Sequence, residues 1–227
     1  MTEEPWTLLD TAQIPGNSGE LQLYQRADEF SISVLGSGVL MSTWAHGSED
    51  ALAELACRKI AGRAGPRVLI GGLGMGFTLA AALRCLGSDA LLDVAELVPA
   101  VVAWNRGPLG EHAGHPLRDD RVVVRTGDVA KVLRAARQAY DAILLDVDNG
   151  PEGLTRKKND WLYTADGLTE CYTALRPEGV LAIWSAGADR DFTERLRKTG
   201  FRAKQTRVRE YENKGDLHAI WLAERGP

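Results

Sequence analysis

From residue 67 onwards, short apolar runs alternate with segments whose apolar residues recur at helical spacing. The runs are RVLIG, ALLDVAE, RVVVRTG, YDAILLDVD and GVLAIWSA, and helical segments such as FTLAAALRCLG and VPAVVAWNR lie between them. Apolar strands that alternate with helices form a parallel sheet covered on both faces. Two long final runs, at 201–211 and 216–225, flank the turn sequence ENKG. The pattern therefore predicts an α/β fold with a doubly wound, mostly parallel seven-stranded sheet that closes with an antiparallel hairpin.

The first 45 residues have a different pattern. LQLYQR (21–26), EFSISVLG (29–36) and GVLMST (38–43) alternate between apolar and polar positions and are separated by short turns. Such a series predicts a small antiparallel β meander. Ser48 is expected to cap the helix that follows, with Glu49 and Asp50 in its first turn. We therefore expect two domains, a β meander at 1–45 and a Rossmann-like ligand-binding domain at 46–227.

Composition excludes several classes of protein. The chain has 227 residues, 44% hydrophobic and 26% charged, which is typical of a folded globular protein. No apolar run reaches the ~18–20 residues that span a membrane, and the acidic start lacks the features of a signal peptide. Three widely spaced cysteines indicate reduced thiols in a cytoplasmic protein. The basic stretch at 195–209 indicates either a nucleic-acid patch or a solvated helix face and edge strand, and we favour the second.

The strongest local signal is a glycine-rich loop. Gly71, Gly72, Gly74 and Gly76 follow the first parallel strand and precede a helix. Glycines at such a junction allow positive φ angles and let a ligand approach the backbone closely. The spacing is G-x-G-x-G, which differs from the dinucleotide-binding spacing G-x-G-x-x-G. We expect these four glycines to form part of a cofactor site.

Two acidic residues follow the next two strands. Glu96 ends the second strand, where an acid can accept hydrogen bonds from both ribose hydroxyls, although it could instead cap a helix. Asp128 follows the third strand, where an acid can accept from an adenine amino group, and it could also be an N-cap. Together with the glycine loop, these acids indicate S-adenosylmethionine rather than NAD.

The end of the fourth strand supplies the candidate catalytic groups. Asp146 and Asp148 lie where the reaction crevice of such a sheet is found, and a carboxylate there can bind a cationic amine and take its proton. A surface turn could also explain this Asp-rich sequence. Asn149, Trp161 and Tyr163 are candidates for substrate binding, although the two aromatic residues could equally anchor the core. The histidines have no acidic or cysteine neighbours at ligand spacing, so no metal is expected.

These motifs resemble the spermidine synthase (polyamine aminopropyltransferase) superfamily, which has the class I S-adenosylmethionine-dependent methyltransferase fold. RVLIGGLGMG resembles its glycine motif, VAELVP its ribose-binding acid, RTGD its adenine-side acid and YDAILLDVDNGPEG its catalytic strand end. LMSTWAHGSEDALAELA resembles the entry into its catalytic domain. The resemblance implies that Glu96 holds the ribose, Asp128 the adenine side, and Asp146 the reactive centre.

The chain departs from that family at three places. Gly74 occupies the position of an aspartate that grips the amine of the decarboxylated cofactor. The Asp-Ser-Ser-Asp strand end is shortened, and a tyrosine–histidine pair after the meander is replaced by DALAE (50–54). We therefore predict an S-adenosylmethionine-dependent methyltransferase that acts on a small amine. The alternatives are aminopropyl transfer from decarboxylated S-adenosylmethionine to a polyamine, and a non-catalytic cofactor-binding module. We also expect a homodimer, with the meander as a dimer surface.

Overall fold

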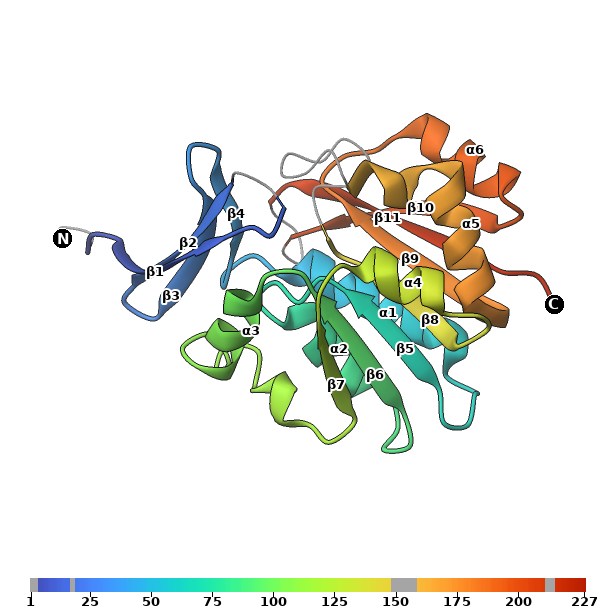
Figure 1. The fold of residues 1–227 in the computed structure, drawn as a ribbon, viewed down its shortest axis with the longest axis horizontal. Helices are drawn as coiled ribbons and strands as arrows, with labels where there is room; N and C mark the ends of the chain where they lie inside the picture. Colours follow the sequence, from blue (N-terminus) through green and yellow to red (C-terminus); the bar gives the residue numbers. More distant parts are fainter. Residues whose placement is uncertain (1–3, 17–18, 148–158, 211–214) are drawn as a thin grey trace.

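The computed structural model describes residues 4–16, 19–147, 159–210 and 215–227. The N-terminal residues form an antiparallel sheet whose strands follow one another in order (Figure 1). This confirms the predicted meander but adds a fourth strand that the sequence pattern did not indicate. That strand, β1, is exposed along almost its whole length, so it lacks the alternation that marks a half-buried strand. The strands are β1 (Thr7–Gln13), β2 (Glu20–Arg26), β3 (Glu29–Val34) and β4 (Gly38–Ser42).

The second sheet has seven strands, as predicted, in the order β10-β11-β9-β8-β5-β6-β7. All its neighbouring strands pair in parallel except for β11, which runs antiparallel to both β9 and β10. The predicted turn at 212–214 lies outside the described residues. The strands are β5 (Arg67–Gly71), β6 (Leu91–Glu96), β7 (Val122–Thr126), β8 (Tyr140–Leu145), β9 (Leu175–Ser185), β10 (Arg202–Arg209) and β11 (Leu217–Glu224).

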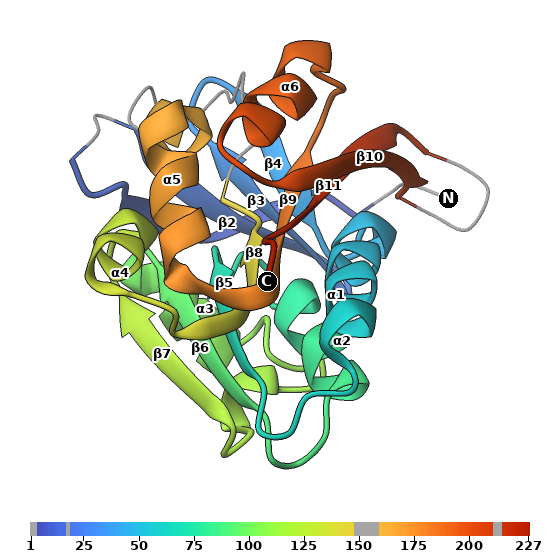
Figure 2. The same cartoon turned by 90° about the vertical axis from the view of Figure 1, so that its right-hand side faces the viewer.

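Helices cover both faces of the large sheet (Figure 2). Val68 and Ile70 of β5 belong to the core that contains the first three helices, whereas Leu69 belongs to the core that contains the last three. This alternation explains why the strand is apolar at every position. The first three helices are α1 (Gly47–Ile60), α2 (Phe77–Cys85) and α3 (Pro99–Arg106), and the last three are α4 (Val129–Ala135), α5 (Ala165–Ala174) and α6 (Arg190–Lys198).

The small sheet packs onto the α1–α3 side of the molecule. Leu23 and Ile32 are fully buried members of the same core as α1 and α2. The Phe30 ring meets His112 edge-on at 5.1 Å. The indole Nε1 of Trp104 in α3 donates a 2.7 Å hydrogen bond to Asp10 in β1. The two sheets therefore share apolar core and polar contacts, although the predicted domain boundary at 45/46 stays a prediction.

The start of α1 differs from the sequence-based expectation. His46, not Ser48, precedes the helix, and Ser48 is buried in its first turn. The backbone N–H of Gly47 donates a 2.9 Å hydrogen bond to the carbonyl of Glu210, just after β10. A Cβ at Gly47 would lie 2.4 Å from that oxygen. The Ser48 prediction is wrong because this contact between residues distant in sequence, rather than a local cap, fixes where the helix begins.

The basic stretch lies on the outer face of α6 and on the edge strand β10. Its arginines make local contacts, such as Arg197 with Glu194 and Arg202 with Glu224. The structure thus places these residues where the helix-face and edge-strand alternative expects them. Across the described ranges, no helix is both long and apolar enough to cross a membrane.

Candidate active site

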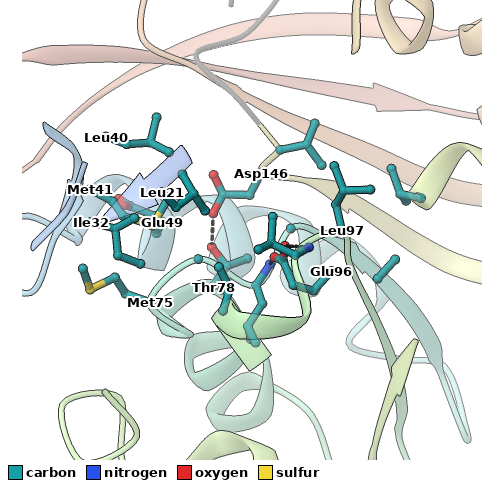
Figure 3. A pocket seen from close by; sticks show the side chains of 18 of the residues that line it. Leu21, Ile32, Leu40, Met41, Glu49, Met75, Thr78, Glu96, Leu97 and Asp146 are labelled. Atoms are coloured by element: carbon teal, nitrogen blue, oxygen red, sulfur yellow. Dashed lines mark hydrogen bonds between the residues drawn. The ribbon is translucent and has the colours of Figure 1, made fainter. Parts of the chain in front are cut away.

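A cavity lies between the small sheet and the carboxyl ends of the parallel strands (Figure 3). The walls come from the small sheet, the first turns of α1 and α2, the loops after β5, β6, β7 and β8, and one residue each of α3 and β9, Val101 and Trp184. Ligand sites in doubly wound folds occur at this edge of the sheet. The polar and charged side chains that line it are those of Glu49, Thr78, Glu96, Asp128, Asp146 and Trp184.

The glycine loop forms the floor of the cavity. Gly72, Gly74 and Gly76 have φ angles of +90°, +52° and +86°, so a side chain would be strained at all three positions. A Cβ at Gly72 would also lie 2.1 Å from the carbonyl oxygen of Asp146. Gly72 and Gly74 line the cavity, whereas Gly71 and Gly76 shape the ends of the turn. The loop therefore presents backbone, not side chains, to a ligand.

Asn105 in α3 holds the glycine loop in place. Asn105 is 1% exposed. Its side-chain amide nitrogen donates a 2.8 Å hydrogen bond to the carbonyl of Gly74 and a 2.9 Å hydrogen bond to the carbonyl of Val101. Sequence analysis did not single out this residue. A buried asparagine in an otherwise apolar helix was the available signal, since a buried amide needs hydrogen-bond partners.

Glu96 sits at the end of β6 and is almost completely buried. Its two carboxylate oxygens accept hydrogen bonds from the backbone N–H groups of Leu73 (2.9 Å) and Val98 (2.8 Å). Burial raises its pKa, and these backbone donors oppose the rise. The backbone N–H groups of Gly74 and Leu97 also favour its charged form. The carboxylate lines the cavity, where it can accept from a ligand hydroxyl.

Asp128 is the N-cap of α4. Its carboxylate accepts a 2.9 Å hydrogen bond from the backbone N–H of Ala130, which is the capping role expected from the sequence. The residue also lines the cavity, so capping leaves it available to a ligand. The backbone N–H of Gly127 donates to the carbonyl of Glu96 at 2.7 Å. This hydrogen bond holds the two acid-bearing loops side by side.

Asp146 follows β8 and faces the cavity from above the glycine loop (Figure 3). Its Oδ2 accepts a 2.8 Å hydrogen bond from the hydroxyl of Thr78 in the first turn of α2. Burial raises the pKa of this carboxyl; the Thr78 hydrogen bond and the nearby His218 counteract the rise. Asp146 is thus a carboxylate held in a low-dielectric site and poised to bind a proton or a cation.

Glu49, in the first turn of α1, is a second carboxylate in the same part of the cavity (Figure 3). Burial, followed by the charge of Asp146, raises its pKa to about 7. The hydroxyl of Ser48 donates to it at 2.6 Å. Sequence analysis treated Glu49 as an ordinary first-turn acid. Its only sequence signal was its place in the segment that resembles the entry into the family's catalytic domain.

Of the remaining predicted site residues, Trp161 and Tyr163 are not brought into the cavity. Asp148 and Asn149 lie outside the described residues. Trp161 packs beneath Arg134, whose guanidinium lies 3.9 Å from the ring centroid, and Tyr163 is buried against Phe192. Both aromatic residues belong to the core of the α4–α6 face, which was the alternative to a substrate-binding role. Among the described residues, no cluster of three or more His, Cys, Asp or Glu side chains could hold a metal ion.

No protein-family model and no curated protein sequence matches this chain. Solved structures do match. The spermidine synthase of Thermotoga maritima is 17% identical with a TM-score of 0.75, and the match covers 96% of this chain and 73% of that one. A spermidine synthase in complex with the transition state analogue AdoDATO is 17% identical with a TM-score of 0.74, and the match covers 96% of this chain and 72% of that one. A probable spermidine synthase from Corynebacterium glutamicum is 15% identical with a TM-score of 0.65, and the match covers 96% of this chain and 79% of that one. The chain therefore has the fold of the spermidine synthases, small N-terminal sheet included.

Proposed function

We propose that this protein is a transferase that moves an alkyl group from an adenosylsulfonium donor to an amine. The observation that carries the proposal is the placement of two carboxylates with raised pKa values, Glu49 and Asp146, in the same cavity as the glycine loop and Glu96. Buried, perturbed acids in a cleft are typical of active sites. Here they lie together, whereas Glu96 lies at the other end of the cavity (Figure 3).

The adenosyl end fits the donor. Glu96 and Asp128 supply carboxylates that line the cavity side by side, and Gly72 has no side chain where the donor must approach Asp146. We assign Glu96 to the ribose, Asp128 to the adenine side and the loop to the centre of the donor.

The two carboxylates prepare the acceptor. An ammonium group bound between them gives up one proton to a carboxylate, which frees the nitrogen lone pair. The donor supplies an electrophilic carbon next to its sulfonium. As the nitrogen–carbon bond forms there, the carbon–sulfur bond breaks and its electron pair stays on sulfur. Alignment of nitrogen, carbon and sulfur in one cavity accounts for most of the expected acceleration.

Aminopropyl transfer from decarboxylated S-adenosylmethionine is the form of this reaction that we favour. Support comes from the solved structures that match 96% of this chain. These are spermidine synthases, and one of them is in complex with AdoDATO. The two adjacent carboxylates also suit a reaction in which donor and acceptor each carry an ammonium group.

Methyl transfer from intact S-adenosylmethionine is the second candidate, and Gly74 favours it. A Cβ at Gly74 would lie 3.2 Å from the sulfur of Met41 and would stand in strained backbone geometry. The loop therefore offers no carboxylate to an aminopropyl ammonium at this position. If this position decides the choice of donor, the intact donor should bind at least as well as the decarboxylated one.

The two forms differ in their by-products. The purified protein is incubated with each donor and a panel of primary amines, and nucleoside products are identified by mass spectrometry. Release of methylthioadenosine from the decarboxylated donor supports aminopropyl transfer. Release of S-adenosylhomocysteine from the intact donor supports methyl transfer. If neither nucleoside forms and calorimetry detects no donor binding, the proposal is wrong.

A further inference from the structure

The end of the cavity that holds Glu49 and Asp146 is bounded by an apolar wall. The small sheet supplies most of it, through Ile14, Leu21, Ile32, Leu40 and Met41 of β2, β3, β4 and the turn after β1. Met75 of the glycine loop lies on the same side (Figure 3). Leu21, Ile32, Leu40 and Met41 lie on the same side of Asp146 as Glu49, whereas Glu96 and Leu97 lie on the other side (Figure 3). The wall therefore faces the acceptor end, not the adenosyl end.

The wall is preformed. Leu21 and Ile32 are 5% and 0% exposed and are packed in the main core, so they cannot turn away to admit water. Leu40 and Met41 lie on the cavity side of β4, and the neighbouring Val39 points outward and is 64% exposed. A β-bulge at Leu40 breaks the alternation of β4: Met41 pairs with Ile32, whereas Val39 pairs with Ser33, so Leu40 and Met41 reach the cavity from a strand that is otherwise exposed.

We infer that the acceptor is a primary amine with an apolar chain: its ammonium binds between Glu49 and Asp146, and its chain lies along Leu21, Leu40 and Met41. This inference rests on the proposed function and names its substrate class. A chain of methylene groups gains free energy by leaving water against such a wall. A second ammonium at the far end of the chain would instead have to be desolvated against hydrocarbon.

Two amines of the same length separate these cases. Hexylamine and hexamethylenediamine are titrated by calorimetry into protein saturated with methylthioadenosine, which fills the adenosyl end. We expect hexylamine to bind at least tenfold more tightly. Equal or tighter binding of the diamine would overturn the substrate class while leaving the proposed transferase intact. Binding of neither amine to loaded protein also overturns the inference. If methylthioadenosine itself does not bind, the proposed function fails with it.

A charge placed in the wall should reverse the preference. Leu40→Glu adds a carboxylate facing the cavity, and we expect it to weaken hexylamine at least tenfold and to make the diamine the tighter ligand. Val39→Glu adds the same charge one residue away on the outer face and should leave both affinities unchanged. Methylthioadenosine affinity serves as the folding control for each variant. If Leu40→Glu binds methylthioadenosine normally but retains the wild-type order of amines, the wall does not contact the acceptor.

Discussion

Two buried aspartates at opposite ends of β8 show how differently one strand can treat the same charge. Asp141, near its start, accepts hydrogen bonds from the guanidiniums of Arg63 (2.6 Å) and Arg176 (2.7 Å) and from the backbone N–H of Arg67 (2.7 Å). Asp146, just after its end, accepts one from the neutral hydroxyl of Thr78. In the described part of the chain, no arginine or lysine pairs with Asp146.

The difference separates a structural charge from a reactive one. Asp141 is 2% exposed, and its two arginines offset the cost of burying it. Asp146 has no such compensation, so burial raises its pKa and leaves it ready for a cation from outside. Asp146 keeps some exposure to the cavity, but the larger difference between the two residues is the charge of their partners.

The largest effect should come from removing the compensated charge. Asp141→Asn leaves Arg63 and Arg176 without their anion, and we expect a loss of about 3 kcal/mol in the free energy of unfolding. For a chain of this size, that corresponds to a fall of roughly 6–12 °C in melting temperature. Calorimetric melting measures it. Affinity for methylthioadenosine well below the midpoint should be unchanged, and an unaltered melting temperature would contradict a structural role for Asp141.

Next in size is the loss of the uncompensated charge. Asp146→Asn keeps an acceptor for Thr78 but removes the proton acceptor, so we expect turnover to fall about 100-fold, equivalent to about 2.7 kcal/mol. Donor affinity and melting temperature should not fall. Steady-state release of the nucleoside by-product measures the effect. A turn-forming role alone would leave turnover at the wild-type rate, because asparagine also favours turns.

A smaller effect is expected at the adenosyl end. Glu96→Ala removes the charged acceptor for both ribose hydroxyls, and we expect methylthioadenosine to bind more than tenfold more weakly, a loss of at least about 1.4 kcal/mol. Calorimetric titration measures it. Glu111→Ala, at an exposed acid on the loop after α3, is the matched control. Unchanged affinity in Glu96→Ala would refute the assignment of the ribose.

The smallest effect concerns Glu49 and is read from pH. The folded protein holds a proton on Glu49 up to a pKa of about 7, whereas the unfolded chain releases it near 4.5. Between these values the folded state binds more protons, so this residue lowers stability as pH rises through the window. Glu49→Gln should remove that decline. The full shift corresponds to about 3 kcal/mol, and because Glu49 is only half-buried we expect solvent screening to reduce the gain to about 1 kcal/mol at pH 8 relative to pH 4.5. Denaturant unfolding of both proteins at the two pH values tests it, with Glu54→Gln, on the exposed side of the same helix, as the control.

The parallel sheet and its adenosyl end were predictable because their signals are local. The apolar runs, the glycine spacing and the acids after β6 and β7 each follow directly from neighbouring residues, and the structure places Gly72, Gly74, Glu96 and Asp128 around one cavity.

The acceptor end was not predictable, because segments distant in sequence build it. Glu49 becomes a site residue only when α1 is placed beside the end of β8, and Leu21, Ile32 and Leu40 look like ordinary core positions of a meander. Trp161 and Tyr163, which local aromatic character made candidates, face the other core instead. Strand β1 was missed for a related reason: exposure on nearly every residue removes the alternation by which a strand is recognised.

The hydrogen bond between Gly47 and Glu210 has a consequence for the order in which parts of the cavity fold during synthesis. Residues 67–147, which build the floor and adenosyl end of the cavity, come before β10 in the chain, but one hydrogen bond at the N-terminus of α1 is accepted by the carbonyl of residue 210. Contacts across such a sequence separation form late in folding. A growing chain would thus have the means to hold an adenosyl group before Glu49 reaches its final place. Premature termination before β10 should yield a protein that retains nucleoside but cannot select an acceptor.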